Sequence, residues 1–260
     1  MVQRYVAIGD STVEGLDDPD GRGGYRGWAD RLAEKLAEVN PDLRYANLAI
    51  RGRVSAQVRA EQLEPALALK PDLVTLVAGL NDLLRPKYSL HQTMTNLQVM
   101  HTALISAGAT VLTFTMPDLT PIAPVTKIVR GRLLTYNNAL RVLCRRTGAT
   151  LVEVDREPIC ADPRLWSDDR LHANSHGHAR IAAALAEGLG LPGADGSWRD
   201  PLPPLEAQTW QNVVAAEIGW LRAHFVPWIG RHIKGVSSGD GVTPKRPTLE
   251  PFAAAVETSG

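Results

Sequence analysis

Short apolar runs alternate with amphipathic helical patterns along the first 190 residues, and this alternation restricts the fold more than any other feature of the sequence. Five runs are rich in β-forming residues, and each is followed by apolar residues at helical spacing. The predicted strands cover residues 5–9, 43–50, 72–78, 109–116 and 149–155. The predicted helices cover residues 25–39, 55–69, 90–107, 127–147 and 175–189. Five such alternations favour a parallel sheet with helices on both faces.

Connections between parallel strands are almost always right-handed, and this rule reduces the number of possible strand orders. The expected fold is an α/β three-layer αβα sandwich with a five-stranded parallel sheet and flavodoxin-like topology. Residues 1–191 form this domain. Sheets of this kind bind ligands beyond the carboxyl ends of their strands, so the segments that follow the strands are where chemistry is expected.

The composition changes after residue 191. Residues 192–204 are rich in Pro, Gly and Asp and predict a linker. Residues 205–235 predict a C-terminal amphipathic helix with an aromatic face that includes Trp210, Phe225 and Trp228. We expect this helix to pack on the domain or on a second copy of the chain, giving a homodimer, rather than on a membrane surface. Residues 236–260 predict an extended or disordered tail.

The charge balance excludes several classes of partner. Lys and Arg number 28 and Asp and Glu also 28, so no overall charge draws the chain toward nucleic acid or anionic lipid. No apolar run reaches the ~18 residues of a membrane span, and the N-terminus has no signal-like segment. Two cysteines, Cys144 and Cys160, cannot form a disulfide framework. We therefore expect a cytoplasmic protein without nucleic-acid partners or stable membrane insertion.

Polar or glycine residues follow four of the predicted strands. They are Ser11 after the first strand, Gly52 after the second, Asn81 and Asp82 after the third, and Asp169 and His172 after the fifth. The carboxyl ends of parallel strands share one edge of the sheet, so these residues are expected to meet there. A turn or helix N-cap is the simpler interpretation of Asp10 and Ser11 taken alone.

Taken together, these residues supply the groups that acyl transfer requires. A serine hydroxyl becomes an effective nucleophile when a neighbouring imidazole takes its proton, and a carboxylate fixes the tautomer of that imidazole. Asp169 and His172 are three residues apart, which suits such a pair within one turn. Backbone N–H groups of Ser11 and Gly52 and the side-chain amide of Asn81 are candidate donors to an oxyanion.

Four segments resemble the four conserved blocks of the GDSL/SGNH hydrolases. They are Gly9-Asp10-Ser11, Gly52, Gly79-Leu80-Asn81-Asp82 and Asp169-Arg170-Leu171-His172. The resemblance spans residues 3–190 and implies a serine nucleophile at Ser11, a base at His172 and an orienting acid at Asp169. It also implies an oxyanion hole formed by Ser11, Gly52 and Asn81. Thr12 and Ala173 depart from the residues usual in the family, and the Gly-x-Ser-x-Gly elbow of α/β-hydrolases is absent.

Three further residues are expected to support the site. Asp10 and Asp82 are interpreted as structural, positioning the serine turn and the asparagine loop, and Gly79 precedes that loop. The predicted protein is a serine hydrolase that cleaves carboxylic esters of small or short-chain acyl groups without a cofactor or metal. An acyltransferase or an O-acetyl carbohydrate esterase with the same triad is the alternative.

Two interpretations from other classes remain open at this point. The domain could act as a non-catalytic interaction module through its aromatic C-terminal helix. Alternatively, a metal-dependent hydrolase could bind its ion through the histidines and aspartates of one segment, namely His172, His176, His178, Asp168 and Asp169. The segment contains no Glu at the position of the general base of a His-Glu-x-x-His site.

Overall fold

The computed structural model describes residues 1–204 and 239–252, and its centre is a six-stranded β-sheet. The strands are β1 (Arg4–Gly9), β2 (Arg44–Asn47), β3 (Leu73–Val77), β4 (Thr110–Phe114), β5 (Thr150–Val152) and β6 (Arg246–Pro251). Their order is β5-β4-β3-β1-β2-β6, and β1 to β5 pair in parallel. The order 2-1-3-4-5 of the parallel strands is that of flavodoxin-like sheets, as predicted.

The prediction of a five-stranded, entirely parallel sheet is wrong at one edge. Strand β6, from the segment predicted as a tail, pairs antiparallel with β2, with Arg44 opposite Pro251 and Asn47 opposite Arg246. It contains Pro247 and Pro251, which an edge strand tolerates because one side of it has no neighbouring strand. The sheet is therefore mixed.

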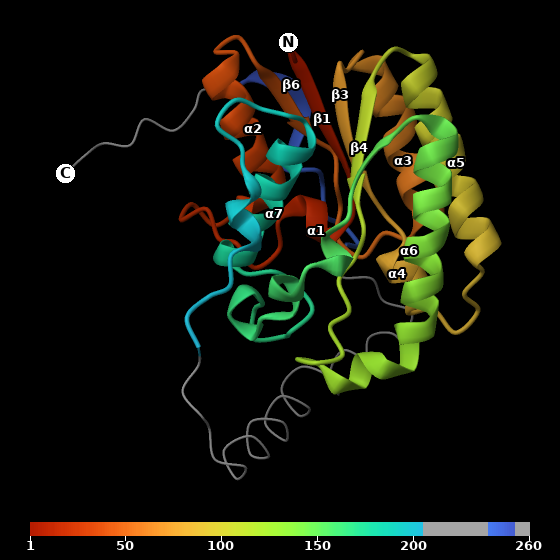
Figure 1. The fold of residues 1–260 in the computed structure, drawn as a ribbon. Coiled ribbons are helices and arrows are strands. Elements are labelled where there is room, and N and C mark those ends of the chain that lie inside the picture. Colours follow the sequence, from red (N-terminus) through yellow and green to blue (C-terminus); the bar gives the residue numbers. More distant parts are fainter. Residues whose placement is uncertain (205–238, 253–260) are drawn as a thin grey trace.

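Helices cover both faces of the sheet (Figure 1). The longer helices are α2 (Gly27–Val39), α3 (Ser55–Ala68), α5 (Leu90–Ser106), α6 (Lys127–Thr147) and α7 (Ser175–Gly188), each within two residues of its predicted bounds. In Figure 1, α2 and α7 lie on one side of the strands and α3, α5 and α6 on the other. The short helices α1 (Ser11–Glu14) and α4 (Leu80–Leu83) follow β1 and β3 directly. Five 3₁₀ turns complete the described elements: η1 (Pro124–Thr126), η2 (Val154–Arg156), η3 (Pro158–Ala161), η4 (Pro163–Leu165) and η5 (Gly196–Arg199).

The strands divide the apolar core into two layers. Successive side chains of a strand point to opposite faces, so Tyr5 and Ala7 of β1 join the layer beneath α2 and α7. Val6 and Ile8 join the layer beneath α3, α5 and α6. Strand β1 is therefore buried on both faces, and its packing fixes the position of Asp10 and Ser11, which follow it.

The segment predicted as a linker, residues 192–204, folds back onto α7. Trp198 in η5 is buried and donates a hydrogen bond from Nε1 to Glu187 Oε2 at 2.6 Å. Arg180 of α7 donates to the carbonyl oxygens of Trp198 and Asp200. The predicted helix at 205–235, with its predicted dimer contact, lies outside the described residues, as do residues 236–238 and 253–260.

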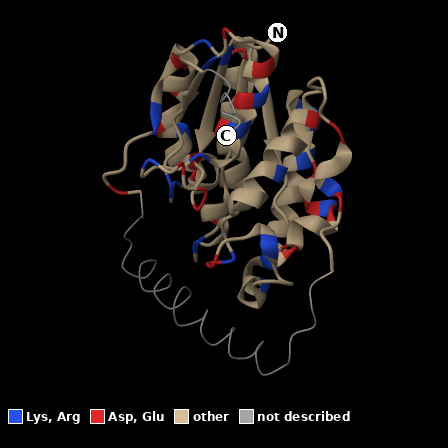
Figure 2. Cartoon of the chain, turned by 90° about the vertical axis from the view of Figure 1, so that its left-hand side faces the viewer, with Lys and Arg blue, Asp and Glu red and all other residues tan. Residues whose placement is uncertain are grey.

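Acidic and basic residues are interspersed over the described ribbon (Figure 2). This distribution agrees with the zero formal net charge of the sequence. None of the helices in residues 1–204 and 239–252 combines the length and apolar character that crossing a membrane requires.

Candidate active site

Ser11 lies at the point where β1 ends and α1 begins. Gly9 has φ +154°, and a Cβ there would come within 2.2 Å of the Val77 carbonyl oxygen on β3, so the approach of the two strands requires glycine. Asp10 then caps α1, and its Oδ1 accepts from the Thr12 N–H at 3.1 Å. Ser11 is thus held at the carboxyl edge of the sheet with 8% of its surface exposed.

A tight turn before α7 carries the predicted acid and base. Asp169 Oδ1 accepts from the backbone N–H groups of Leu171 (2.8 Å) and His172 (2.9 Å) and from the hydroxyl of Ser167 (2.7 Å). Its other oxygen, Oδ2, lies 2.6 Å from His172 Nδ1. On the opposite side of the ring, His172 Nε2 lies 3.0 Å from Ser11 Oγ. The structure therefore links Asp169, His172 and Ser11 by hydrogen bonds.

The pKa values of the two partners shift in opposite directions. Burial alone would lower the pKa of His172, but its hydrogen bond to Asp169 and the negative charges of Asp169, Asp17 and Asp10 raise it above the ordinary value. Burial favours the neutral form of Asp169, yet the hydrogen bonds from His172 and Leu171 hold its pKa well below the usual range. Asp169 is therefore ionised at neutral pH and favours protonation of the ring.

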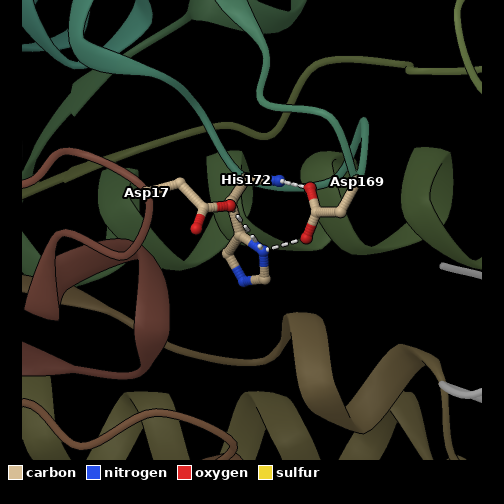
Figure 3. Close-up of side chains that lie close together, drawn as sticks. All are labelled: Asp17, Asp169 and His172. Carbon is tan, nitrogen blue, oxygen red and sulfur yellow. Dashed lines mark hydrogen bonds and ion pairs between the residues drawn. The ribbon is translucent and has the colours of Figure 1, made fainter. Parts of the chain in front are cut away.

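A second carboxylate, which was not predicted, approaches the same ring nitrogen. Asp17 Oδ2 lies 4.0 Å from His172 Nδ1, and Figure 3 shows Asp17 and Asp169 on separate loops with the imidazole between them. Asp17 has φ +66°, a left-handed conformation uncommon for a residue with a side chain. Its neighbours hold this loop: Leu16 O accepts from His178 Nε2 at 3.0 Å, and Asp18 pairs with Arg31 at 2.9 Å.

Two backbone N–H groups are available as oxyanion donors. Within the described part of the chain, neither the Ser11 N–H nor the Gly52 N–H is donated to another group. Gly52 has φ +74° in the turn after β2. The preceding residue, Arg51, donates from its backbone N–H to Glu14 Oε2 at 2.8 Å, which ties this turn to the end of α1.

The side-chain amide of Asn81, in contrast, already has partners. Asn81 Nδ2 donates to Asp10 Oδ2 at 3.2 Å and to the Arg53 carbonyl oxygen at 3.1 Å. Burial raises the pKa of Asp10 to about 6, and hydrogen bonds from Thr12 offset only part of this effect. Asn81 therefore connects the serine turn with the loop after Gly52, and donation to an oxyanion requires it to give up one of these two bonds.

Asp82 and Gly79, which were predicted to support the site, both make close contacts near it. Asp82 accepts from the N–H (2.7 Å) and hydroxyl (2.6 Å) of Ser55, the first residue of α3, and so fixes the far end of the Gly52 loop. Gly79 has φ +117°, and a Cβ there would lie 2.7 Å from the Tyr136 ring. Tyr136 in turn donates to the Ala78 carbonyl oxygen at 2.7 Å, which explains the close packing.

Gln62 and Glu14 also hold the serine turn, and neither was predicted. The side chain of Gln62, buried in α3, accepts from the Gly9 N–H at 2.8 Å and donates to the Gly9 carbonyl oxygen at 2.9 Å. Glu14 is also buried, and it binds both the backbone and the guanidinium of Arg51. These contacts join residues 53 and 37 positions apart, so no local pattern indicates them.

The histidines do not form the cluster that the metal interpretation requires. His178 is buried, its Nδ1 accepts from the Trp28 N–H at 3.1 Å, and burial lowers its pKa to about 4. His176 is exposed on the first turn of α7. Among described residues, the group with metal-ligand spacing is Asp17, Asp169 and His172. Both ring nitrogens of His172 already have hydrogen-bond partners, Nδ1 with Asp169 and Nε2 with Ser11. These three residues therefore fit acyl transfer better than metal binding.

A largely apolar cavity of about 210 Å³ adjoins Ser11 and His172. Its walls include Trp28 from α2, Phe114 at the end of β4, and Ile181 and Ala184 from α7. The candidate nucleophile therefore lies beside a largely apolar hollow rather than on a flat polar surface.

Fold and site together define a class of proteins: a flavodoxin-like sheet that carries a serine, a histidine and a carboxylate at the ends of its strands. A profile of the GDSL-like Lipase/Acylhydrolase family matches residues 7–180, which is more than half of the chain. The protein therefore belongs to this family, the SGNH hydrolases, and the resemblance noted in the sequence is confirmed. No curated protein matches the chain at a significant level.

Solved structures share the fold at low sequence identity. An alpha/beta hydrolase enzyme from the metagenome of Lake Arreo, Spain, superposes with a TM-score of 0.62 at 23% identity, covering 73% of this chain and 95% of its own. TesA gives a TM-score of 0.60 at 24% identity, covering 72% and 98%. An acetylxylan esterase from Geobacillus stearothermophilus gives 0.62 at 19%, covering 75% and 97%. These similarities establish the fold.

Proposed function

We propose that this protein is a serine ester hydrolase in which Ser11 is the nucleophile, His172 the base and Asp169 the orienting acid. The observation that carries the proposal is the run of hydrogen bonds from Asp169 Oδ2 to His172 Nδ1 (2.6 Å) and from His172 Nε2 to Ser11 Oγ (3.0 Å). The carboxylate keeps the proton of neutral His172 on Nδ1, which leaves the Nε2 lone pair free to accept the serine proton.

The reaction proceeds through an acyl-enzyme. Ser11 Oγ attacks the ester carbonyl carbon while its proton passes to His172 Nε2. The tetrahedral intermediate collapses, the C–O bond to the alcohol breaks, and His172 returns the proton to the leaving alkoxide. Water then attacks the acyl-serine and gives its proton to His172. The second intermediate collapses, the bond between the acyl carbon and Ser11 Oγ breaks, and His172 returns the proton to Oγ, which releases the carboxylic acid and restores the Ser11 hydroxyl.

The oxyanion of each intermediate requires hydrogen-bond donors. The backbone N–H groups of Ser11 and Gly52 have no partner within the described part of the chain, which makes them available for this role. Asn81 is the third donor, and it turns one amide hydrogen from Asp10 or from the Arg53 carbonyl toward the substrate oxygen. No cofactor enters any of these steps.

The substrate class is a carboxylic ester, and the alternative concerns the acceptor. In the first alternative, an acyltransferase, the same acyl-enzyme transfers its acyl group to an alcohol or amine in place of water. In the second, an O-acetyl carbohydrate esterase, the acyl-enzyme forms from an O-acetylated sugar. Analysis of the products in the presence of added glycerol distinguishes hydrolysis from transfer, because transfer yields an acylglycerol.

Labelling with a fluorophosphonate tests the proposed nucleophile. We expect the reagent to modify Ser11 and to abolish hydrolysis of p-nitrophenyl esters, and we expect Ser11→Ala to lose both labelling and hydrolysis. Ser106→Ala, at the exposed end of α5, is the matched control and should retain both. Esterase activity that survives in Ser11→Ala would overturn the proposal.

The same experiment tests the two alternatives from other classes. Hydrolysis that persists in Ser11→Ala and disappears with EDTA would support the metal interpretation. A folded protein that neither reacts with the fluorophosphonate nor hydrolyses any ester in the series would support an interaction module.

A further inference from the structure

The cavity beside Ser11 extends well into the core. Gly177 and Ala184 both line it, and they lie seven positions apart on one face of α7, or about 10 Å along the helix axis. Trp198, from the segment after the domain, lines the cavity together with Ala184. On the side of α4 and α6, the walls include Leu83 and Leu133. The cavity therefore leads from the reacting serine into the layer between the sheet and α7.

The charged side chains in the lining outside the candidate catalytic residues are already paired. Arg130 donates to Asp118 at 2.5 Å, and Arg180 donates to the carbonyl oxygens of Trp198 and Asp200. One buried donor in the lining, the indole Nε1 of Trp28, lacks an acceptor in the described part of the chain, and a single N–H can serve only one hydroxyl group of a ligand. A sugar carries several hydroxyl groups, each of which requires a partner when buried, so this lining disfavours a sugar and favours a hydrocarbon.

The volume sets an approximate length for such a hydrocarbon. A cavity of about 150 Å³ accommodates benzene, which has six carbon atoms. By the same ratio, 210 Å³ accommodates roughly eight carbon atoms. An acetyl group would leave most of this space unfilled, and a chain of sixteen carbons would exceed it.

We infer that the cavity binds the linear, apolar acyl chain of a medium-length ester, with Ala184 leaving room for the chain and Trp198 limiting its length. This inference rests on the proposed function, because it places the acyl carbonyl at Ser11. It also differs from the short-chain substrate predicted from the sequence. Trp198 suits its role because Glu187 holds its indole N–H at 2.6 Å and the Arg199 guanidinium lies 4.1 Å from its ring centre.

A series of p-nitrophenyl esters with the full-length protein tests the chain length. We expect kcat/KM to peak at the octanoate (C8), at least tenfold above the acetate (C2), and to fall again at the palmitate (C16). A peak at the acetate would overturn the inference. Faster hydrolysis of an acetylated sugar than of the octanoate would overturn it as well.

Two substitutions change the cavity in opposite directions. Ala184→Leu fills it, so the C8/C2 ratio of kcat/KM should fall at least tenfold. Trp198→Ala enlarges it, so the C12/C8 ratio should rise at least fivefold. Ala179→Leu, exposed on the same helix, is the matched control and should change neither ratio. Equal changes of the C8/C2 ratio in Ala184→Leu and Ala179→Leu would contradict the inference. If Ala184→Leu does not fold, the C12/C8 ratio of Trp198→Ala tests it, and an unchanged ratio would contradict the inference.

Fluorophosphonate labelling separates the two possible failures. A protein that is labelled at Ser11 but prefers the acetate retains the proposed function and loses the inference on chain length. A protein that is neither labelled nor active loses the proposed function. In that case calorimetry with octanoate still tests the cavity, because binding that Ala184→Leu weakens and Ala179→Leu does not would support it. Absence of octanoate binding would overturn it.

Discussion

Glu14 and Arg51 join the two ends of the candidate active site through one short helix. Helix α1 begins at Ser11 and ends at Glu14, whose carboxylate accepts the Arg51 backbone N–H at 2.8 Å. The Arg51 Nε lies 3.0 Å from the same carboxylate. Helix α1 therefore positions both groups: its first residue is the serine, and its last residue holds the turn that presents the Gly52 N–H.

Replacing Glu14 with Gln should separate these two elements. The substitution removes the charge that holds Arg51, so we expect kcat to fall about tenfold because the Gly52 N–H is less well placed. The free energy of unfolding should fall by about 2 kcal/mol, the usual contribution of a hydrogen bond to a charged group. Ester kinetics and urea unfolding measure the two effects.

Glu61→Gln is the control for this experiment. Glu61 pairs with Arg53 in the same region of the chain, but its side chain is 38% exposed, so its ion pair contributes little. Equal losses of kcat in the two variants would show that Glu14 does not position the Gly52 turn.

Ser11 and His172 should behave as a unit. Ser11→Ala and His172→Ala are each expected to lower kcat by several orders of magnitude, and the double variant should lose little more, because either change removes proton transfer to the base. Steady-state hydrolysis of the preferred p-nitrophenyl ester measures this. Additive losses in the double variant would mean that the two residues act in separate steps.

Asn81→Ala should lower kcat by about 10²–10³ if the amide donates to the oxyanion. The structure adds a complication, because Asn81 also bonds Asp10 and the Arg53 carbonyl oxygen. Asn81→Asp keeps the size of the side chain and removes the donor, so it should lose as much kcat as Asn81→Ala. A loss below tenfold in both variants would exclude Asn81 from the oxyanion hole.

Asp17 should affect the pH dependence of the reaction. His172 accepts the serine proton only when it is neutral, so kcat/KM rises as the pH increases through its pKa. Although burial lowers this pKa, Asp169 and Asp17 raise it overall. Asp17→Asn removes one of these negative charges, and the acid limb of the pH profile should move to lower pH. Asp20→Asn, at an exposed position of the same loop, should leave the acid limb in place; equal shifts in both variants would show that Asp17 has no specific effect.

Gln62 should stabilise the strand end that precedes the serine. Gln62→Leu removes the partners of both the N–H and the carbonyl oxygen of Gly9 in a buried site. Each unsatisfied buried group costs about 1–3 kcal/mol, so we expect unfolding at markedly lower urea concentration. Gln92→Leu, exposed on α5, should not change the midpoint, and similar midpoints for the two variants would contradict the assigned role.

The sequence was sufficient to predict those elements that depend on residues close together in the chain. The five longer helices follow from apolar spacing, and α6 ends at Thr147 before Gly148, which has the left-handed conformation typical of the residue after a helix. The polar residues that follow the strands were predictable because parallel strands share one edge. Both kinds of inference use residues close together in the sequence.

The missed features depend on distant contacts. Strand β6 follows the segment outside the described residues, contains two prolines and is mostly exposed, so nothing in its sequence indicates pairing with β2. Asp17 approaches His172 across more than 150 positions, and only folding brings their loops together. The short-chain substrate stays a prediction, and the cavity that bears on it forms between α7 and segments far away in the sequence.

Strand β6 also covers an edge of the sheet that would otherwise be open to pairing with another chain. An unpaired edge strand offers a row of free N–H and C=O groups to any other chain, and β2 would form such an edge without β6. Lys245, next to β6, reinforces the cover by pairing with Asp30 of α2 at 2.8 Å. The last described strand thus covers β2, and a chain that ended before residue 239 would expose the N–H and C=O groups of β2 as a template for aggregation.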